Sequence, residues 1–175
     1  KISKLKSGSN KRALNIEDIE KIRNFDCLKN PSFVNSKNYF VFSYFTRGMN
    51  FYDMMMLTWD NIEGEKIIYK RRKTKTNFSI KITPPIQEIL NYYKKYNKNN
   101  TNYIFPILLE NNLSPIQIEY RKDKVLKKFN KDLKDIAKLC EIDAKITSYV
   151  ARHSFATNLK QKGVLDEEVA IWLSN

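Results

Sequence analysis

Cysteine is scarce in this chain: Cys27 and Cys140 are the only two among 175 residues. Two thiols are too few for a framework of disulfides, so we expect a reducing compartment, the cytoplasm. The first fifteen residues are basic and polar, and they lack the apolar segment of a secretory signal. No apolar run approaches the length of a membrane span, so we expect no membrane partner.

Acidic residues are also in the minority. The chain has 32 Lys and Arg against 19 Asp and Glu, a formal net charge of +13. Such a field attracts polyanions, of which nucleic acid is the commonest. A lysine- and asparagine-rich composition inherited from an AT-rich genome is the alternative explanation. The charge therefore supports a nucleic-acid partner without establishing one.

The length allows one substantial domain, and a hydrophobic content of 42% can supply its core. The chain starts at Lys1 rather than at Met, so we expect it to be a piece of a longer protein. Residues 1–13 are basic and are expected to be the flexible remnant of a linker. Residues 14–175 are expected to form a single domain.

The spacing of apolar residues predicts mostly helices. Helical periodicity follows a candidate cap at Asn15 and recurs over 36–46, 50–58, from Pro84, over 116–141, around Arg152 up to Gly163, and from about Asp166. A period of two predicts strands over 66–71 and 78–82 with a turn at 74–77, and 60–62 can add a third strand. The expected fold is mainly α with a small antiparallel β-sheet, an α+β class.

The segment around Arg152 has the features of an anion site. Thr147 and Ser148 can cap a helix, which places Arg152 about one turn inside it. Backbone N–H groups and the positive end of the helix dipole lie there. Since the planar guanidinium matches phosphate better than an ammonium does, this segment predicts a phosphate-binding helix start.

Arg47 interrupts an otherwise apolar pair of helices, next to a tight turn at Gly48. A charge in such surroundings is costly unless it is paired or meets a ligand. The two interpretations are a salt bridge to Asp53 at the start of the next helix and a position in a binding site.

Basic residues crowd the predicted hairpin, at Lys70, Arg71, Arg72, Lys73 and Lys75. A two-stranded ribbon can enter a groove of DNA and hold an ammonium beside the backbone. The alternative is an exposed basic turn that adds only non-specific attraction. One face of the 116–141 helix is also rich in lysine, and it is either solvated or in contact with DNA.

Taken in order, these segments resemble the catalytic domain of the tyrosine recombinases, the phage-integrase family. The resemblance covers nearly the whole chain, and the amino-acid sequences of its motifs are most similar to those of integrases of conjugative and mobilisable elements. The matching pieces are Arg12-Ala13-Leu14, Phe42–Asp53, Leu57-Thr58-Trp59, Tyr69–Thr74, Tyr103–Pro106 and Arg152–Thr157.

The resemblance implies roles for the basic residues. Arg47 and Arg152 match the two arginines that grip the scissile phosphate, and Lys73 matches the lysine that protonates the departing 5′ oxygen. A tyrosine attacks the phosphorus and forms a 3′-phosphotyrosyl link, so rejoining needs neither ATP nor a metal or other cofactor. Contacts to double-stranded DNA are expected from Lys70, Arg71, Arg72, Lys75 and Arg12.

The chain departs from the family pattern at two positions. Tyr149 occupies the slot of a histidine, and a phenol with a usual pKa near 10 is a poor base at neutral pH. We expect Tyr149 to position the phosphate or to be a core aromatic, and the neighbouring His153 to point inward as a structural residue. Asn175 falls on a later His or Trp slot, where its amide can donate a hydrogen bond to a phosphate.

The nucleophilic tyrosine is expected several residues beyond position 175. The chain as given is therefore expected to bind DNA weakly, not to cleave it, and to be monomeric, whereas the parent protein is expected to be a tetramer on two duplexes.

A catalytically silent DNA-binding relative is the alternative, and the retained Arg47, Lys73 and Arg152 favour the enzyme. An unrelated helical nucleic-acid module does not account for the ordered motifs. Related topoisomerases share the chemistry, but the sequences of the motifs favour an integrase.

Overall fold

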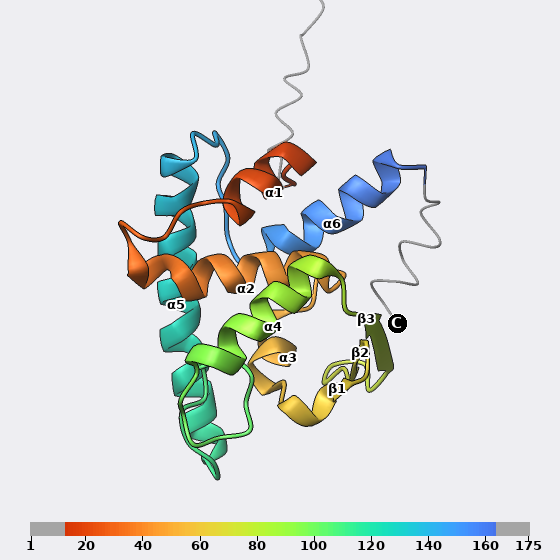
Figure 1. The fold of residues 1–175 in the computed structure, drawn as a ribbon, viewed down its shortest axis with the longest axis vertical. Coiled ribbons are helices and arrows are strands. Elements are labelled where there is room, and N and C mark those ends of the chain that lie inside the picture. The colour runs from red at the N-terminus through yellow and green to blue at the C-terminus, as the bar shows by residue number, and fades with distance from the viewer. Residues whose placement is uncertain (1–12, 164–175) are drawn as a thin grey trace, which may run out of the picture.

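The computed structural model describes residues 13–163, which form a mainly helical domain with a small antiparallel sheet, as the sequence predicts (Figure 1). Residues 1–12, including Arg12, and the last predicted helix, including Asn175, lie outside the described residues. In order, the elements are α1 (Ile16–Arg23), η1 (Pro31–Phe33), α2 (Val34–Phe45), α3 (Phe51–Met56), η2 (Trp59–Asn61), β1 (Ile62–Glu63), β2 (Lys66–Lys70), β3 (Asn77–Lys81), α4 (Pro84–Tyr96), α5 (Pro115–Leu139) and α6 (Val150–Gln161).

Side-chain caps determine where several helices begin. Asn15 accepts a hydrogen bond from the Asp18 N–H at the start of α1, which confirms the predicted cap. Asn50 does the same for α3 through the Asp53 N–H. The helix α3 is shorter than predicted because Leu57 already has extended backbone angles, φ −63° and ψ 133°.

The three strands form one sheet in the order β1-β2-β3, and both pairs are antiparallel. Ile67 pairs with Ile80 and Tyr69 with Phe78, so the predicted alternation is confirmed. The connecting turn is longer than predicted, because β2 ends at Lys70 and the Arg71 N–H donates to the Thr76 carbonyl (2.8 Å). The third strand is Ile62–Glu63, since residues 59–61 form a turn of 3-10 helix instead.

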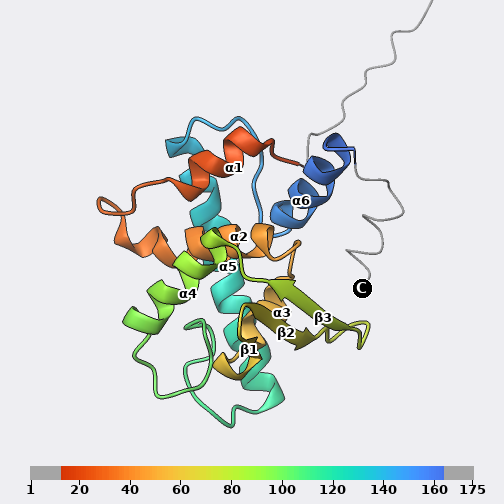
Figure 2. The same ribbon diagram turned by 45° about the vertical axis from the view of Figure 1, so that its right-hand side comes forward.

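The core surrounds α2, which packs against α1, α4, α5 and α6. Figures 1 and 2 show α2 crossing the middle of the domain between α4 and α5. Aromatic rings fill the contacts: Phe42 lies 4.8 Å from Phe105, and Tyr39 lies 5.6 Å from Phe129, centroid to centroid. Both pairs are edge-on, the geometry that the ring quadrupoles favour. Within residues 13–163, no helix combines the length and the apolar character that crossing a bilayer requires.

The segment before α1 is attached to α6. The Leu14 N–H donates to the Ser154 hydroxyl oxygen (2.8 Å), and that hydroxyl donates to the Val150 carbonyl (2.7 Å). Leu14 and Ser154 are both buried, so this connection is protected from competing water. The first turn of α6 is therefore held from the N-terminal side of the domain.

The turn after α2 comes unusually close to α6. Arg47 and Gly48 both have left-handed backbone angles, φ 60° and 74°, which confirms the tight turn predicted at Gly48. A Cβ atom on Gly48 would lie 2.7 Å from Cγ and 2.8 Å from Cα of Arg152. The Arg152 guanidinium also donates to the Gly48 carbonyl (3.2 Å). Only glycine allows this approach.

Substituting Gly48→Ala is expected to destabilise the domain for two reasons. The left-handed backbone costs about 1 kcal/mol for any side chain, and the clash with Arg152 adds about 1–3 kcal/mol of overpacking. Gly64→Ala is the matched control, because Gly64 also has a positive φ (58°) but no atom within 4 Å of the place a methyl group would take. Urea unfolding of the two variants measures the difference, and equal losses would contradict the close contact.

Candidate functional site

Arg152 is the third residue of α6, so its predicted place in the first turn is confirmed. The predicted cap is wrong: Tyr149 is the cap residue, and its side chain makes no capping bond. The turn before the helix is held instead from α5, where the Asn130 side chain accepts from the Ser148 N–H (2.8 Å). The Val150 N–H donates to the Thr147 carbonyl (2.9 Å). The positive end of the helix dipole still favours an anion beside Arg152.

A second cation lies near Arg152. The pKa of Arg152 is below its usual value, mainly because burial disfavours the charged form and next because Arg71 repels it. Tyr149, Tyr69 and Asp53 act in the opposite direction. A guanidinium stays charged at neutral pH despite such a shift, so the region gathers like charges that an anion would relieve.

Tyr69 of β2 is influenced by the charged groups of the same region. Its pKa is raised, mainly by burial and then by the charge of Asp53, while Arg71, Arg152 and Arg47 each act to lower it. The three arginines therefore lie close enough to Tyr69 to influence the same hydroxyl. They come from the turn after α2, the β2–β3 hairpin and the start of α6, and we call Arg47, Arg71 and Arg152 the arginine cluster.

Asp53 lies in the first turn of α3, where its carboxylate has partners other than Arg47. Its carboxylate accepts from the side-chain amide of Asn50 (2.5 Å) and from the backbone N–H of Arg72 (3.2 Å). Across residues 13–163 no salt bridge joins Arg47 to Asp53, so that alternative is wrong. Arg47 is half-buried, and its left-handed backbone is a strained state of the kind that persists where the surrounding packing requires it.

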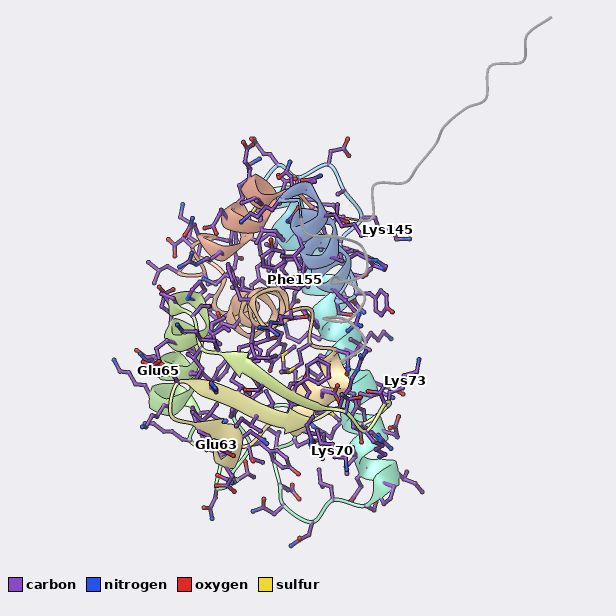
Figure 3. All side chains as sticks on the ribbon, turned by 90° about the vertical axis from the view of Figure 1, so that its right-hand side faces the viewer. Glu63, Glu65, Lys70, Lys73, Lys145 and Phe155 are labelled. Carbon is purple, nitrogen blue, oxygen red and sulfur yellow. The ribbon has the colours of Figure 1, made fainter. Side chains whose placement is uncertain are left out.

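Lys73 is exposed at the end of the hairpin, and within residues 13–163 it forms no ion pair. Figure 3 shows Lys73 and Lys145 projecting on the same side of the molecule, with Glu63 and Glu65 at the opposite end of the sheet. The structure thus brings three arginines near one another. Lys73 lies on the exposed tip of the hairpin, two residues after Arg71. Lys70 and Lys75 are exposed as well.

The sequence did not predict two aromatic residues, Tyr69 and Tyr52, as part of the site. The ring of Tyr52 lies under the guanidinium of Arg72, with 4.1 Å from Cζ to the ring centroid. Tyr52 directly precedes Asp53, and Tyr69 directly precedes the basic residues Lys70 and Arg71. Neither signal distinguishes these tyrosines from core residues without the fold.

Tyr149 is 62% exposed, so it is not a core aromatic. Its ring meets His153 edge-on, with centroids 5.0 Å apart. His153, expected to point inward as a structural residue, is half-buried and lines a groove. One turn separates the two residues, which places both rings on one face at the start of α6.

That groove has a volume of about 930 Å³ and lies between the second half of α5 and the loop before α6. Four exposed lysines line it: Lys131, Lys134, Lys138 and Lys145. Within the described part of the chain none of them forms a salt bridge. Asp135 and Asp143 also line the groove, which leaves an excess of two positive charges. We call it the lysine groove.

Three solved structures share this fold. A XerA recombinase matches with a TM-score of 0.65 at 15% identity, over 93% of this chain and 54% of that one. A lambda integrase (75–356) dimer bound to a COC′ core site matches with a TM-score of 0.59 at 15% identity, over 93% and 57%. The lambda integrase catalytic core matches with a TM-score of 0.61 at 14% identity, over 93% and 90%. The chain thus spans about half the length of the first two.

No curated protein matches the chain at a significant level. The sequence pattern of the phage integrase family does match, over residues 12–173. That match covers almost the whole chain and includes Arg47, Lys73 and Arg152, so the chain belongs to the phage integrase family.

Proposed function

We propose that this domain is the catalytic part of a tyrosine-type, site-specific DNA recombinase. The observation that carries the proposal is the contact of Arg152, at the start of α6, with Gly48 of the turn that includes Arg47, with Arg71 of the hairpin near enough to repel Arg152. A phosphodiester supplies negative charge that complements such a cluster, and family membership supports DNA as its source. The sequences of the motifs support an integrase of a conjugative or mobilisable element, acting in the cytoplasm.

The proposed chemistry assigns one task to each group. Arg47 and Arg152 bind the non-bridging oxygens of the scissile phosphate and offset the charge of the pentavalent transition state. A tyrosine, expected beyond residue 175, forms the bond to phosphorus and loses its proton to solvent. The bond to the 5′ oxygen breaks, and Lys73 donates the proton that makes it a hydroxyl. Arg71 holds a neighbouring phosphate.

The lysine groove supports a longer contact with duplex DNA. Lysine ammonium groups neutralise backbone phosphates without reading sequence, and four of them follow one another along α5 and the next loop. One end of the groove is lined by Tyr149, the cap residue of α6, and by His153, the residue after Arg152. A backbone that leaves the arginine cluster can therefore continue along the groove. In the parent protein we propose a tetramer on two duplexes.

One observation favours a second candidate, a catalytically silent DNA-binding relative. Tyr149 replaces the expected histidine and is exposed, so the site lacks the usual imidazole at that position. In this case the arginine cluster would hold DNA without breaking it.

Strand cleavage distinguishes the two candidates. With a nicked suicide substrate, the protein that includes its nucleophilic tyrosine is expected to form a covalent adduct. Arg152→Ala is expected to slow adduct formation by about 10²–10³-fold, because a preorganised donor to the transition state is lost. Arg23→Ala is the control, since Arg23 pairs with Glu20 and Glu88 on another surface. Absence of any adduct, with DNA affinity as the only property that Arg152→Ala changes, would establish the silent binder.

Salt dependence tests the lysine groove. Each lysine that neutralises a phosphate contributes about 0.9 to the slope of log affinity against log salt. The double substitution of Lys134 and Lys138 by Gln is therefore expected to lower the slope by nearly two. The same change at Lys94 and Lys95, exposed at the end of α4, removes equal charge elsewhere and is expected to leave the slope unchanged. Equal effects of the two pairs would show that only net charge matters.

A further inference from the structure

Arg72 of the β2–β3 hairpin contacts α3 with both its side chain and its backbone. Its guanidinium lies 4.1 Å from the centre of the Tyr52 ring, well within the range of a cation–π contact. Its backbone N–H donates to the Asp53 carboxylate (3.2 Å). Two consecutive residues of α3 therefore hold the side chain and the backbone of the residue that precedes Lys73.

The α3 side of this attachment is rigid. Asp53 is only 6% exposed, and Asn50 both accepts from its N–H (2.9 Å) and donates to its carboxylate (2.5 Å). This reciprocal capping fixes the carboxylate at the first turn of the helix. Tyr52 is half-buried against the core, so its ring has little freedom to move.

The hairpin side has few bonds of its own. The Arg71 N–H donates to the Thr76 carbonyl (2.8 Å), and the Lys75 N–H donates to the Arg71 carbonyl (2.9 Å). Residues 72–75 are exposed, and Lys75 has a left-handed φ of 59°. The Thr76 hydroxyl adds a long bond to the Thr74 carbonyl (3.5 Å), and a short exposed turn with three internal bonds does not by itself keep one conformation. The position of Lys73 therefore depends on how Arg72 is held.

We propose that Tyr52 and Arg72 form a clamp that positions Lys73 for proton transfer to the departing 5′ oxygen. This rests on the proposed function, in which Lys73 is the general acid. Tyr52 is a positioning residue, because it acts through Arg72 and does not touch the reacting atoms. Arg72 was expected to contact DNA, and in the clamp its guanidinium face is instead occupied by the ring.

Loss of the ring is expected to slow strand cleavage. Tyr52→Leu removes the surface on which Arg72 stacks, and a displacement of a catalytic group by about 1 Å costs up to about 10²-fold in rate. Arg72→Gln is expected to have a similar effect. Tyr52→Phe keeps the ring and is expected to retain nearly the full rate. All variants are measured in the protein that includes its nucleophilic tyrosine.

A sulfur atom in place of the bridging 5′ oxygen gives the deciding measurement. A thiol has a usual pKa of about 8.5, so a thiolate leaves without being protonated, whereas the 5′ alkoxide does not. Cleavage of the sulfur substrate is therefore expected to be insensitive to Lys73→Ala and to Tyr52→Leu, although both slow the oxygen substrate. Equal slowing of both substrates by Tyr52→Leu would show a general loss of folding or binding and would overturn the clamp.

The outcomes separate this inference from the function on which it rests. If Lys73→Ala slows both substrates equally, Lys73 is not the general acid, and the proposed role fails. If Lys73→Ala behaves as expected and Tyr52→Leu cleaves the oxygen substrate at the full rate, only the clamp fails.

Two further measurements make the test independent of stability. Amide exchange at Arg71 and Lys75 is expected to accelerate in Tyr52→Leu while the unfolding midpoint stays near that of Tyr52→Phe. An unchanged exchange rate would contradict the clamp. If Arg72→Gln instead lowers the salt slope of DNA binding by about 0.9, Arg72 contacts a phosphate, and the clamp is overturned.

Discussion

The approach of the Gly48 turn to Arg152 is the contact on which the rest of the site depends. It joins residues 104 positions apart, at the end of α2 and the start of α6, with no room for a side chain between them. The guanidinium bond to the Gly48 carbonyl fixes Arg152 and the turn together. Because Arg47 is the next residue back, the same turn sets its position, and two successive left-handed residues maintain it.

A cluster of like charges is the electrostatic consequence of this contact. Arg71 repels the half-buried Arg152, and burial adds to the cost of its charge. The Asp53 carboxylate offsets part of that cost, but it is also engaged by Asn50 and by the Arg72 backbone. Such an arrangement is more favourable with an anion bound than without one. The repulsion between the arginines and the cost of burying Arg152 are therefore located where the proposed phosphate would bind.

Local sequence signals predicted much of the fold. The Asn15 cap, the alternation of β2 and β3, and the long amphipathic helix α5 involve residues near one another in the chain. Signals failed where tertiary contacts decide the outcome. The Ser148 N–H is bound by Asn130 of α5, and α6 begins after Tyr149 without a side-chain cap. Tyr149 does not enter the core; its exposed ring lies at the edge of the groove between α5 and the loop before α6.

The sequence by itself determined the order of the elements and the residue types of the site, since periodicity, turn residues and motif spacing are local properties. It identified Arg47, Lys73 and Arg152 as candidate site residues and placed them near a turn, on a hairpin and at a helix start. Only the tertiary structure decided that Arg71 joins Arg47 and Arg152 while Arg72 lies on Tyr52. These two arginines are adjacent and chemically identical. Their different surroundings come from how the hairpin packs on α3 and faces α6, and no local pattern encodes that geometry.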